Sequence, residues 1–257
     1  MTSRVLVLGL TGAILLTTAC SSRPTATNAP ASTGAAAASK TPGSGLSKVL
    51  FLGDSIAVQE ALPLAAALKA SHVGFQSIAE VGGGNVVGPF SGQHWTTLPA
   101  QITSAKPTVV IYQITTYDWA TPQQQQQAYE KLLATVTGAG AKLIFVTSPP
   151  IKPDDFYQPH MTALNRAPDA ARTVAASSSG KATVLDSSAV WGSTYQQFRD
   201  GTADRSADGI HTCPQGAARF TSWLLGALAK LYPGLTPAPP QTWANAGWSA
   251  SRDFTGC

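Results

Sequence analysis

The stretch that decides the fold is residues 48–55, KVLFLGDS. Its first five residues form a compact apolar run that stops at a glycine, which is typical of a buried strand. Gly53 allows a tight turn after that strand, and apolar residues at helical spacing follow over residues 59–70. The stretch therefore predicts a strand whose carboxyl end presents the Ser55 hydroxyl near the start of a helix. Asp54 is predicted to cap that helix or to brace the loop, with a direct chemical role as the alternative.

Strand-like and helix-like segments alternate along the rest of the chain. Four more strands are predicted at residues 72–79, 107–114, 142–147 and 181–185, and four more helices at residues 98–105, 123–136, 161–177 and 215–231. Apolar strands that alternate with helices predict an α/β fold with a five-stranded parallel sheet covered on both faces. Right-handed crossovers place the carboxyl ends of the strands at one edge, where sites in open sheets lie.

A second polar segment lies in the loop before the last helix, at residues 208–211, DGIH. The carboxylate of Asp208 could orient the imidazole of His211, and this imidazole could activate a serine. The backbone N–H groups beside Ser55, near a helix start, suit an oxyanion. We therefore expect the loop that carries Asp208 and His211 to approach Ser55.

Residues 51–55, FLGDS, and residues 208–211, DGIH, resemble the first and last sequence blocks of the SGNH (GDSL) hydrolase superfamily. The resemblance covers residues 48–232. It implies a flavodoxin-like three-layer α/β/α sandwich, with Ser55 as the nucleophile, His211 as the general base and Asp208 as its orienting partner. The chain contains no Gly-x-Ser-x-Gly motif, which argues against the α/β-hydrolase alternative.

The two middle blocks of the superfamily match less closely. Its oxyanion glycine follows the second strand, where this chain has three glycines at residues 82–84; Gly83 and Gly84 are the candidates that join the N–H of Ser55. Its oxyanion asparagine follows the third strand, but this chain has Tyr117 at that point. Asn85 could substitute in space, or two backbone donors could suffice. Loss of one oxyanion donor typically costs about 2.7–4 kcal/mol of transition-state stabilisation.

The segment Tyr117-Asp118-Trp119, together with Arg205 just ahead of residues 208–211, resembles SGNH domains joined to membrane acyltransferases of actinobacterial envelopes. Such domains are implicated in moving or removing acyl groups on envelope glycans. The candidate residues of the substrate cleft are Asn85, Tyr117, Asp118, Trp119 and Arg205. Two alternatives stay open: Asp118 and Trp119 could anchor a buried loop, and Arg205 could brace Asp208.

The first 20 residues predict an export signal. A positive charge at Arg4 precedes an apolar run over residues 5–16 that is too short for a membrane span. The run leads to a sequence that resembles a bacterial lipobox, with Cys20 as the lipidated residue and threonine where leucine is most usual. Residues 21–47 predict a disordered tether. We expect a lipoprotein at the outer face of the cytoplasmic membrane or in the cell envelope; secretion or an uncleaved anchor are the alternatives.

Lipidation of Cys20 would leave Cys213 and Cys257, and an exported compartment favours a disulfide between them over two free thiols. Residues 233–257 are expected to form a tail that packs on the domain. The remaining composition excludes other classes. The 17 basic and 13 acidic residues are scattered, which argues against nucleic acid. The isolated histidines have no metal-ligand spacing, so no metal or cofactor is expected, and the chain is expected to be a monomer.

The leading functional hypothesis is an exported serine esterase or O-acyltransferase that acts on acyl esters, with O-acyl groups of envelope glycans as substrates. The alternative is a non-catalytic lipoprotein that binds glycans or acyl groups in a degenerate SGNH site. A lipase that acts on long-chain lipids lacks an apparent apolar lid segment.

Overall fold

The computed structural model describes residues 45–257. The predicted export signal, the lipidation of Cys20 and most of the tether lie outside these residues. The folded part begins by residue 46, because the side chain of Leu46 is buried in the core. The Ser47 N–H donates a hydrogen bond to the hydroxyl of Thr108.

The predicted five-stranded parallel sheet is confirmed. The strands are β1 Lys48–Leu52, β2 Gly74–Ser77, β3 Val109–Gln113, β4 Lys142–Val146 and β5 Ala182–Leu185. They lie in the order β2-β1-β3-β4-β5, and every neighbouring pair is parallel. This is the strand order of flavodoxin-like folds, in which β1 and β3 flank the point where the order reverses.

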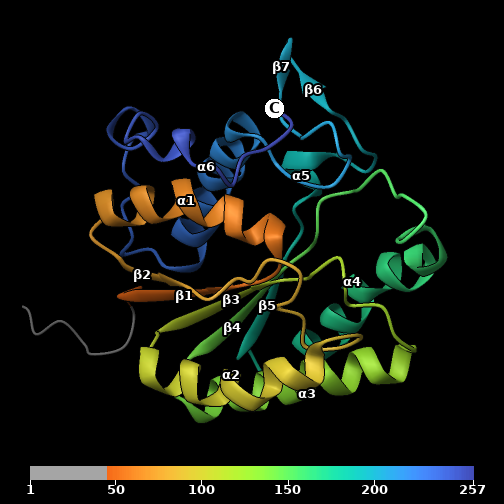
Figure 1. Cartoon of the computed structure of the whole chain (residues 1–257). Coiled ribbons are helices and arrows are strands. Elements are labelled where there is room, and N and C mark those ends of the chain that lie inside the picture. The colour runs from red at the N-terminus through yellow and green to blue at the C-terminus, as the bar shows by residue number, and fades with distance from the viewer. Residues whose placement is uncertain (1–44) are drawn as a thin grey trace, which may run out of the picture. The chain divides into compact units, whose positions relative to one another are not determined.

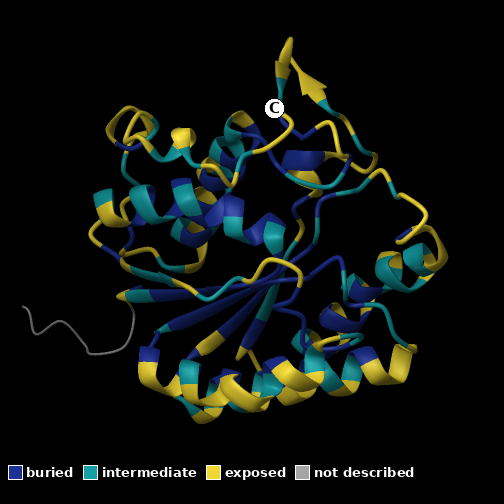
Figure 2. Cartoon of the chain, viewed as in Figure 1, coloured by how far each residue is buried: buried dark blue, intermediate teal, exposed yellow. Residues whose placement is uncertain are grey.

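Helices cover both faces of the sheet (Figure 1). On one face lie α1 Ser55–Ala70 and α6 Pro214–Leu231; on the other lie α2 Ser91–Ala105, α3 Pro122–Gly138 and α4 Met161–Ser177. Successive strand side chains point to opposite faces, so Val49 and Phe51 pack with α1 and α6. Leu50 and Leu52 pack with the other three helices. The three central strands, β1, β3 and β4, are consequently the most deeply buried part of the sheet, whereas the edge strands β2 and β5 are partly exposed (Figure 2).

Helix starts differ most from the sequence prediction. Helix α1 begins at Ser55, four residues before the predicted segment, because the buried Asp54 caps it. Helix α2 begins at Ser91, before the predicted segment 98–105. Its first half, SGQHWTT, is mainly polar and shows no apolar residues at helical spacing. A short helix α5, Ser188–Trp191, and a two-stranded hairpin, β6 Phe198–Arg199 with β7 Thr202–Ala203, were not expected from the sequence.

The chain after α6 lies against α1 and α6. Leu235 and Trp243 are buried in the same apolar cluster as those helices. Two single-turn helices shape the tail, η2 Pro240–Thr242 and η3 Trp248–Ala250. The predicted disulfide Cys213–Cys257 is confirmed and closes the end of the tail onto the start of α6. Within residues 45–257 no helix is both long and apolar enough to cross a membrane.

Candidate active site

Ser55 occupies the first turn of α1, directly after β1. The turn requires glycine at position 53, because φ there is +156° and a Cβ atom would lie 2.5 Å from the Cβ of Ala57. Asp54 is confirmed as both cap and brace. Its Oδ1 accepts the Ile56 N–H at 3.0 Å, and its Oδ2 accepts the Thr116 N–H at 2.7 Å and the Thr116 hydroxyl at 2.8 Å. These bonds fix Ser55 relative to the loop after β3.

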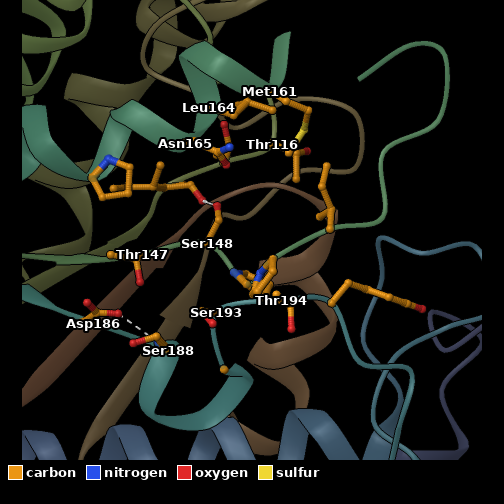
Figure 3. A pocket seen from close by; sticks show the side chains of 18 of the residues that line it. Thr116, Thr147, Ser148, Met161, Leu164, Asn165, Asp186, Ser188, Ser193 and Thr194 are labelled. Carbon is orange, nitrogen blue, oxygen red and sulfur yellow. Dashed lines mark hydrogen bonds between the residues drawn. The ribbon is translucent and has the colours of Figure 1, made fainter. Parts of the chain in front are cut away.

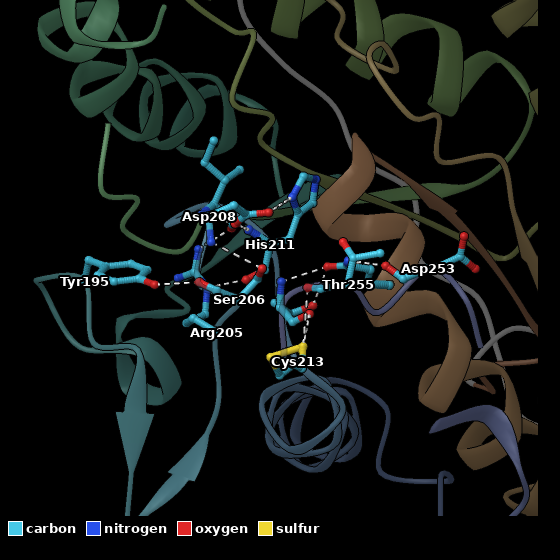
Figure 4. The surroundings of a disulfide bond; sticks show 12 residues. Tyr195, Arg205, Ser206, Asp208, His211, Cys213, Asp253 and Thr255 are labelled. Atoms are coloured by element: carbon cyan, nitrogen blue, oxygen red, sulfur yellow. Dashed lines mark hydrogen bonds and ion pairs between the residues drawn. A yellow bond between two sulfur atoms is a disulfide. The ribbon is translucent and has the colours of Figure 1, made fainter. Parts of the chain in front are cut away.

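The structure brings Ser55, His211 and Asp208 together in one chain of hydrogen bonds. His211 Nε2 lies 2.8 Å from Ser55 Oγ, and His211 Nδ1 lies 2.7 Å from Asp208 Oδ2. Figure 4 shows Asp208 and His211 facing each other on the loop before α6. A hydroxyl, an imidazole and a carboxylate in this order are the parts of an activated nucleophile.

Asp208 is set up to hold the histidine ring. Its Oδ1 accepts the backbone N–H groups of Ile210 and His211 at 2.8 and 3.0 Å, which leaves Oδ2 for the imidazole. Partial burial acts to raise the pKa of Asp208, but the hydrogen bonds from His211 and Ile210 outweigh it, and the pKa is lowered. The carboxylate therefore stays ionised beside the ring.

Arg205 does not line a substrate cleft, and that prediction was wrong. Its side chain is only 1% exposed, and its guanidinium donates to the carbonyl oxygens of Pro150, Ile210 and His211. Burial lowers the pKa of Arg205 to about 10, so the group remains a cation at neutral pH. Arg205 holds the backbone of the histidine loop, whereas the sequence alternative was that it braces Asp208 itself.

Gly84 lies directly against the turn that carries Ser55. Its φ is +77°, and a Cβ atom there would lie 2.0 Å from the carbonyl oxygen of Gly53. Gly83 is also buried, and a Cβ atom there would meet the carboxylate of Glu80 at 3.0 Å. The backbone N–H groups of Ser55, Gly83 and Gly84 donate hydrogen bonds to no residue of the described chain. They are thus available as backbone donors.

Asn85 and Asp118 are buried anchors, and their assignment to the cleft was wrong. The Asn85 amide donates to the carbonyl oxygens of Val87 and Pro89 and is fully buried, so it cannot replace the missing oxyanion asparagine. Asp118 accepts hydrogen bonds from the hydroxyls of Tyr112 and Tyr129. Burial raises the pKa of Asp118 to about 7 despite these donors.

Tyr117 and Trp119 belong to a partly exposed aromatic cluster built by three loops. Their ring centroids are 5.7 Å apart, and Trp119 stacks on His160 at 3.9 Å. The cluster gains Phe90 from the loop after β2 and Phe156 from the loop after β4, each more than half exposed. The sequence analysis missed Phe90 and Phe156, although both are large apolar residues in loops that follow strands.

A pocket of about 510 Å³ lies after β2 and is lined by Gly83 and Gly84 among others. Two others open near the carboxyl ends of the strands. The smaller, about 220 Å³, contains Ser55 and His211 and is otherwise lined by Val58, Gln59, Val81, Asp253 and Thr255. The larger, about 600 Å³, lies beyond β3, β4 and β5 (Figure 3). Thr116, Ser148, Asn165 and Asp186 are among the residues that line this larger pocket. Ser55 does not line it. No pattern in the sequence marks Asp253 or Thr255, which come from the tail, as residues of this pocket.

Among residues 45–257, no three His, Cys, Asp or Glu side chains are grouped so that they could hold a metal ion. No protein-family model matches the sequence, and no curated protein matches it. Solved structures, in contrast, share the fold.

A protein from Slackia heliotrinireducens that is assigned as an SGNH hydrolase aligns with 70% of this chain and 97% of its own, at 20% identity and a TM-score of 0.51. A carbohydrate esterase of family 3 from Talaromyces cellulolyticus aligns with 74% of this chain and all of its own, at 17% identity and a TM-score of 0.52.

A variant of an acetyl-xylooligosaccharide esterase from Geobacillus Stearmophilus aligns with 75% of this chain and 97% of its own, at 13% identity and a TM-score of 0.50. At these identities the likeness establishes the architecture. The chain has the α/β fold of SGNH hydrolases, as the motifs at Ser55 and His211 predicted.

Proposed function

We propose that the protein is a serine esterase or O-acyltransferase that acts on acyl esters through Ser55, His211 and Asp208. The observation that carries this proposal is the continuous hydrogen-bond chain from Ser55 Oγ through the imidazole to the Asp208 carboxylate. Geometry of this kind serves acyl transfer on several unrelated folds.

Each proton has a place in the reaction. Ser55 Oγ attacks the acyl carbonyl carbon while His211 Nε2 takes the hydroxyl proton. The tetrahedral intermediate then collapses: the bond to the alcohol breaks, and His211 returns the proton to the leaving alcohol oxygen. Water or a sugar hydroxyl next attacks the acyl-enzyme, and His211 accepts its proton and returns it to Ser55. Asp208 keeps the Nδ1–H tautomer in place throughout.

The oxyanion would be held by backbone groups. Ser55 is the first residue of α1, so its N–H points out of a helix N-terminus, where negative charge is favoured. Gly84 lies against the same turn and supplies a second backbone N–H. With Tyr117 in place of an asparagine and the Asn85 amide bonded to backbone carbonyls, neither position adds a third donor, so we expect turnover slower than that of a site with three donors.

We further propose that the ester is an O-acyl group on a carbohydrate of the cell envelope and that the protein reaches it as an exported, lipid-anchored protein. Two neighbours in fold are described as esterases of carbohydrates, which supports a carbohydrate ester as the substrate. The apolar run before Cys20 supports export. Rings of the aromatic cluster, such as Tyr117 and Trp119, present apolar surface for a sugar.

The test is hydrolysis of p-nitrophenyl acetate by the wild-type protein and by Ser55→Ala. We expect the substitution to abolish turnover, whereas Ser104→Ala, at an exposed serine on α2, should retain wild-type rates. Equal turnover in wild type and Ser55→Ala would refute the serine mechanism.

A second candidate, a glycan- or acyl-binding protein without turnover, is favoured only by the tyrosine at position 117. Reaction with a fluorophosphonate probe separates the two candidates, because it reports an activated serine without needing a complete catalytic cycle. Labelling of Ser55 supports the enzyme. Glycan binding without labelling supports the binding protein.

A further inference from the structure

The C-terminal tail is fastened to the loop that carries the catalytic histidine. The Cys213–Cys257 disulfide ties the last residue to the N-cap of α6, two residues after His211 (Figure 4). Just before it, the Gly256 carbonyl accepts the Ala207 N–H at 2.9 Å. Gly256 has φ +68°, and a Cβ atom there would lie 2.5 Å from the hydroxyl of Ser206. The tail therefore lies directly on this loop.

A second attachment joins the tail to α1. Gln59, one turn after Ser55, is only 3% exposed and donates to the carbonyl of Asp253 at 2.6 Å. The same amide accepts the Thr212 N–H at 2.7 Å and the Thr212 hydroxyl at 3.0 Å. One buried glutamine thus connects the serine helix, the histidine loop and the tail.

Between these two attachments the tail borders the pocket that contains Ser55. Asp253 and Thr255 line it on one side, and Val58 and Val81 are its apolar side chains. At about 220 Å³ the pocket is small. The acyl group is the apolar part of an acylated sugar, so the valines favour the acyl group over the sugar as the occupant.

We propose that residues 253–255 form a wall of the acyl pocket, so that the tail limits the length of the acyl group placed on Ser55 and the Cys213–Cys257 disulfide holds this wall in position. The inference rests on the proposed esterase or acyltransferase function and adds its substrate class: esters of short acyl chains. Thr255 and the disulfide are specificity-determining features, whereas Gln59 is a positioning residue.

The experiment compares kcat/KM for p-nitrophenyl acetate and p-nitrophenyl octanoate, which share one alcohol and differ only in the acyl chain. The wild-type protein should prefer acetate. Cys257→Ser releases the end of the tail, and Thr255→Gly shortens the wall while keeping the disulfide, so the second variant still reports if the first is poorly folded. In each variant we expect the octanoate-to-acetate ratio of kcat/KM to rise by about fourfold for every additional methylene group of the acyl chain that the pocket can hold.

Two controls make the result specific. Thr242→Gly, at an exposed tail residue that does not line the pocket, should keep the wild-type ratio. Dithiothreitol should raise the ratio in the wild-type protein but leave that of Cys257→Ser unchanged, because this variant has no disulfide to reduce.

The possible failures are distinguishable. One outcome is that turnover requires Ser55 but the octanoate-to-acetate ratio is the same in wild type, Thr255→Gly and Cys257→Ser. This result would refute the proposal that residues 253–255 limit the acyl chain and would leave the proposed function intact. If no ester is turned over, labelling by methyl and octyl fluorophosphonates gives the same comparison without turnover; equal selectivity in all three proteins overturns the wall. Absence of both turnover and labelling overturns the function and the acyl pocket together.

Discussion

Asparagine at position 54 would separate the two roles of this side chain at the start of α1. Asp54→Asn keeps an oxygen that can accept the Ile56 N–H, so the helix cap survives. In the wild-type protein the Thr116 N–H donates to the other carboxylate oxygen at 2.7 Å. In the variant this oxygen is replaced by an NH₂ group, which faces the same N–H. Two donors then point at each other in a site where Asp54 is only 2% exposed.

The size of the effect follows from these contacts. A hydrogen bond to a charged group contributes about 1.5–3 kcal/mol, and a buried donor left without a partner costs about 1–3 kcal/mol. Burial raises the pKa of Asp54, which means that the buried carboxylate itself costs free energy. Its removal therefore offsets part of this loss. We expect Asp54→Asn to lower the free energy of unfolding by about 2–3 kcal/mol. Asp54→Ala also loses the cap and should cost about 1 kcal/mol more.

Thermal unfolding measures this series, because about 1 kcal/mol shifts Tm by about 2–4 °C in a domain of this size. Thr116→Val removes only the hydroxyl donor and is the matched mild variant, so its Tm should lie between those of wild type and Asp54→Asn. Fluorophosphonate labelling of Ser55 should slow in the same order. An Asp54→Asn protein as stable as wild type would refute the role assigned to the Thr116 contact.

Three further predictions concern other parts of the molecule. Reduction of Cys213–Cys257, which spans 44 residues, should lower the free energy of unfolding by about 4 kcal/mol in the chain-entropy model, measured by urea denaturation with and without reductant; equal midpoints would contradict it. Gly84→Ala must displace the Gly53 carbonyl, so it should slow probe labelling of the serine at least tenfold, by about 1.4 kcal/mol, and an unchanged rate would show that this glycine does not support the site. The pKa of Asp118 is raised to about 7, so its stabilising contribution is complete below its ordinary pKa of 3.8 and is lost as pH rises towards 7. Urea unfolding from pH 4 to 7 should therefore show a steeper fall in stability for wild type than for Asp118→Asn, and parallel curves would contradict the shift.

The sheet was predictable because its signal is local. Strands β1, β3, β4 and β5 are short runs of mainly apolar residues. All five strands, including the less apolar edge strand β2, occupy the predicted places, with ends shifted by at most two residues. The approach of the His211 loop to Ser55 was predictable for a related reason. Parallel topology sends the ends of β1 and of the last loop to one edge, so position in the chain fixes position at the site.

The errors concern charged and polar side chains that the fold buries, namely those of Asn85, Asp118 and Arg205. Charged residues are usually exposed, so the sequence could not decide between a cleft position and a buried one for Asp118 and Arg205. The Arg205 guanidinium meets the Pro150 carbonyl, 55 residues away, and Asp118 meets the hydroxyl of Tyr129 across the end of β3. Only the folded chain shows that these partners compensate the cost of burial.

The distance of 156 residues between Ser55 and His211 also has a consequence for timing. The serine helix is made among the first elements of the domain, while the histidine loop, Asp253 and Cys257 come from its last fifty or so residues. A chain that emerges N-terminus first therefore carries Ser55 long before His211 is made. The hydrogen bond between Ser55 and His211, and the disulfide that fastens the tail beside it, can form only after nearly the whole domain has been made.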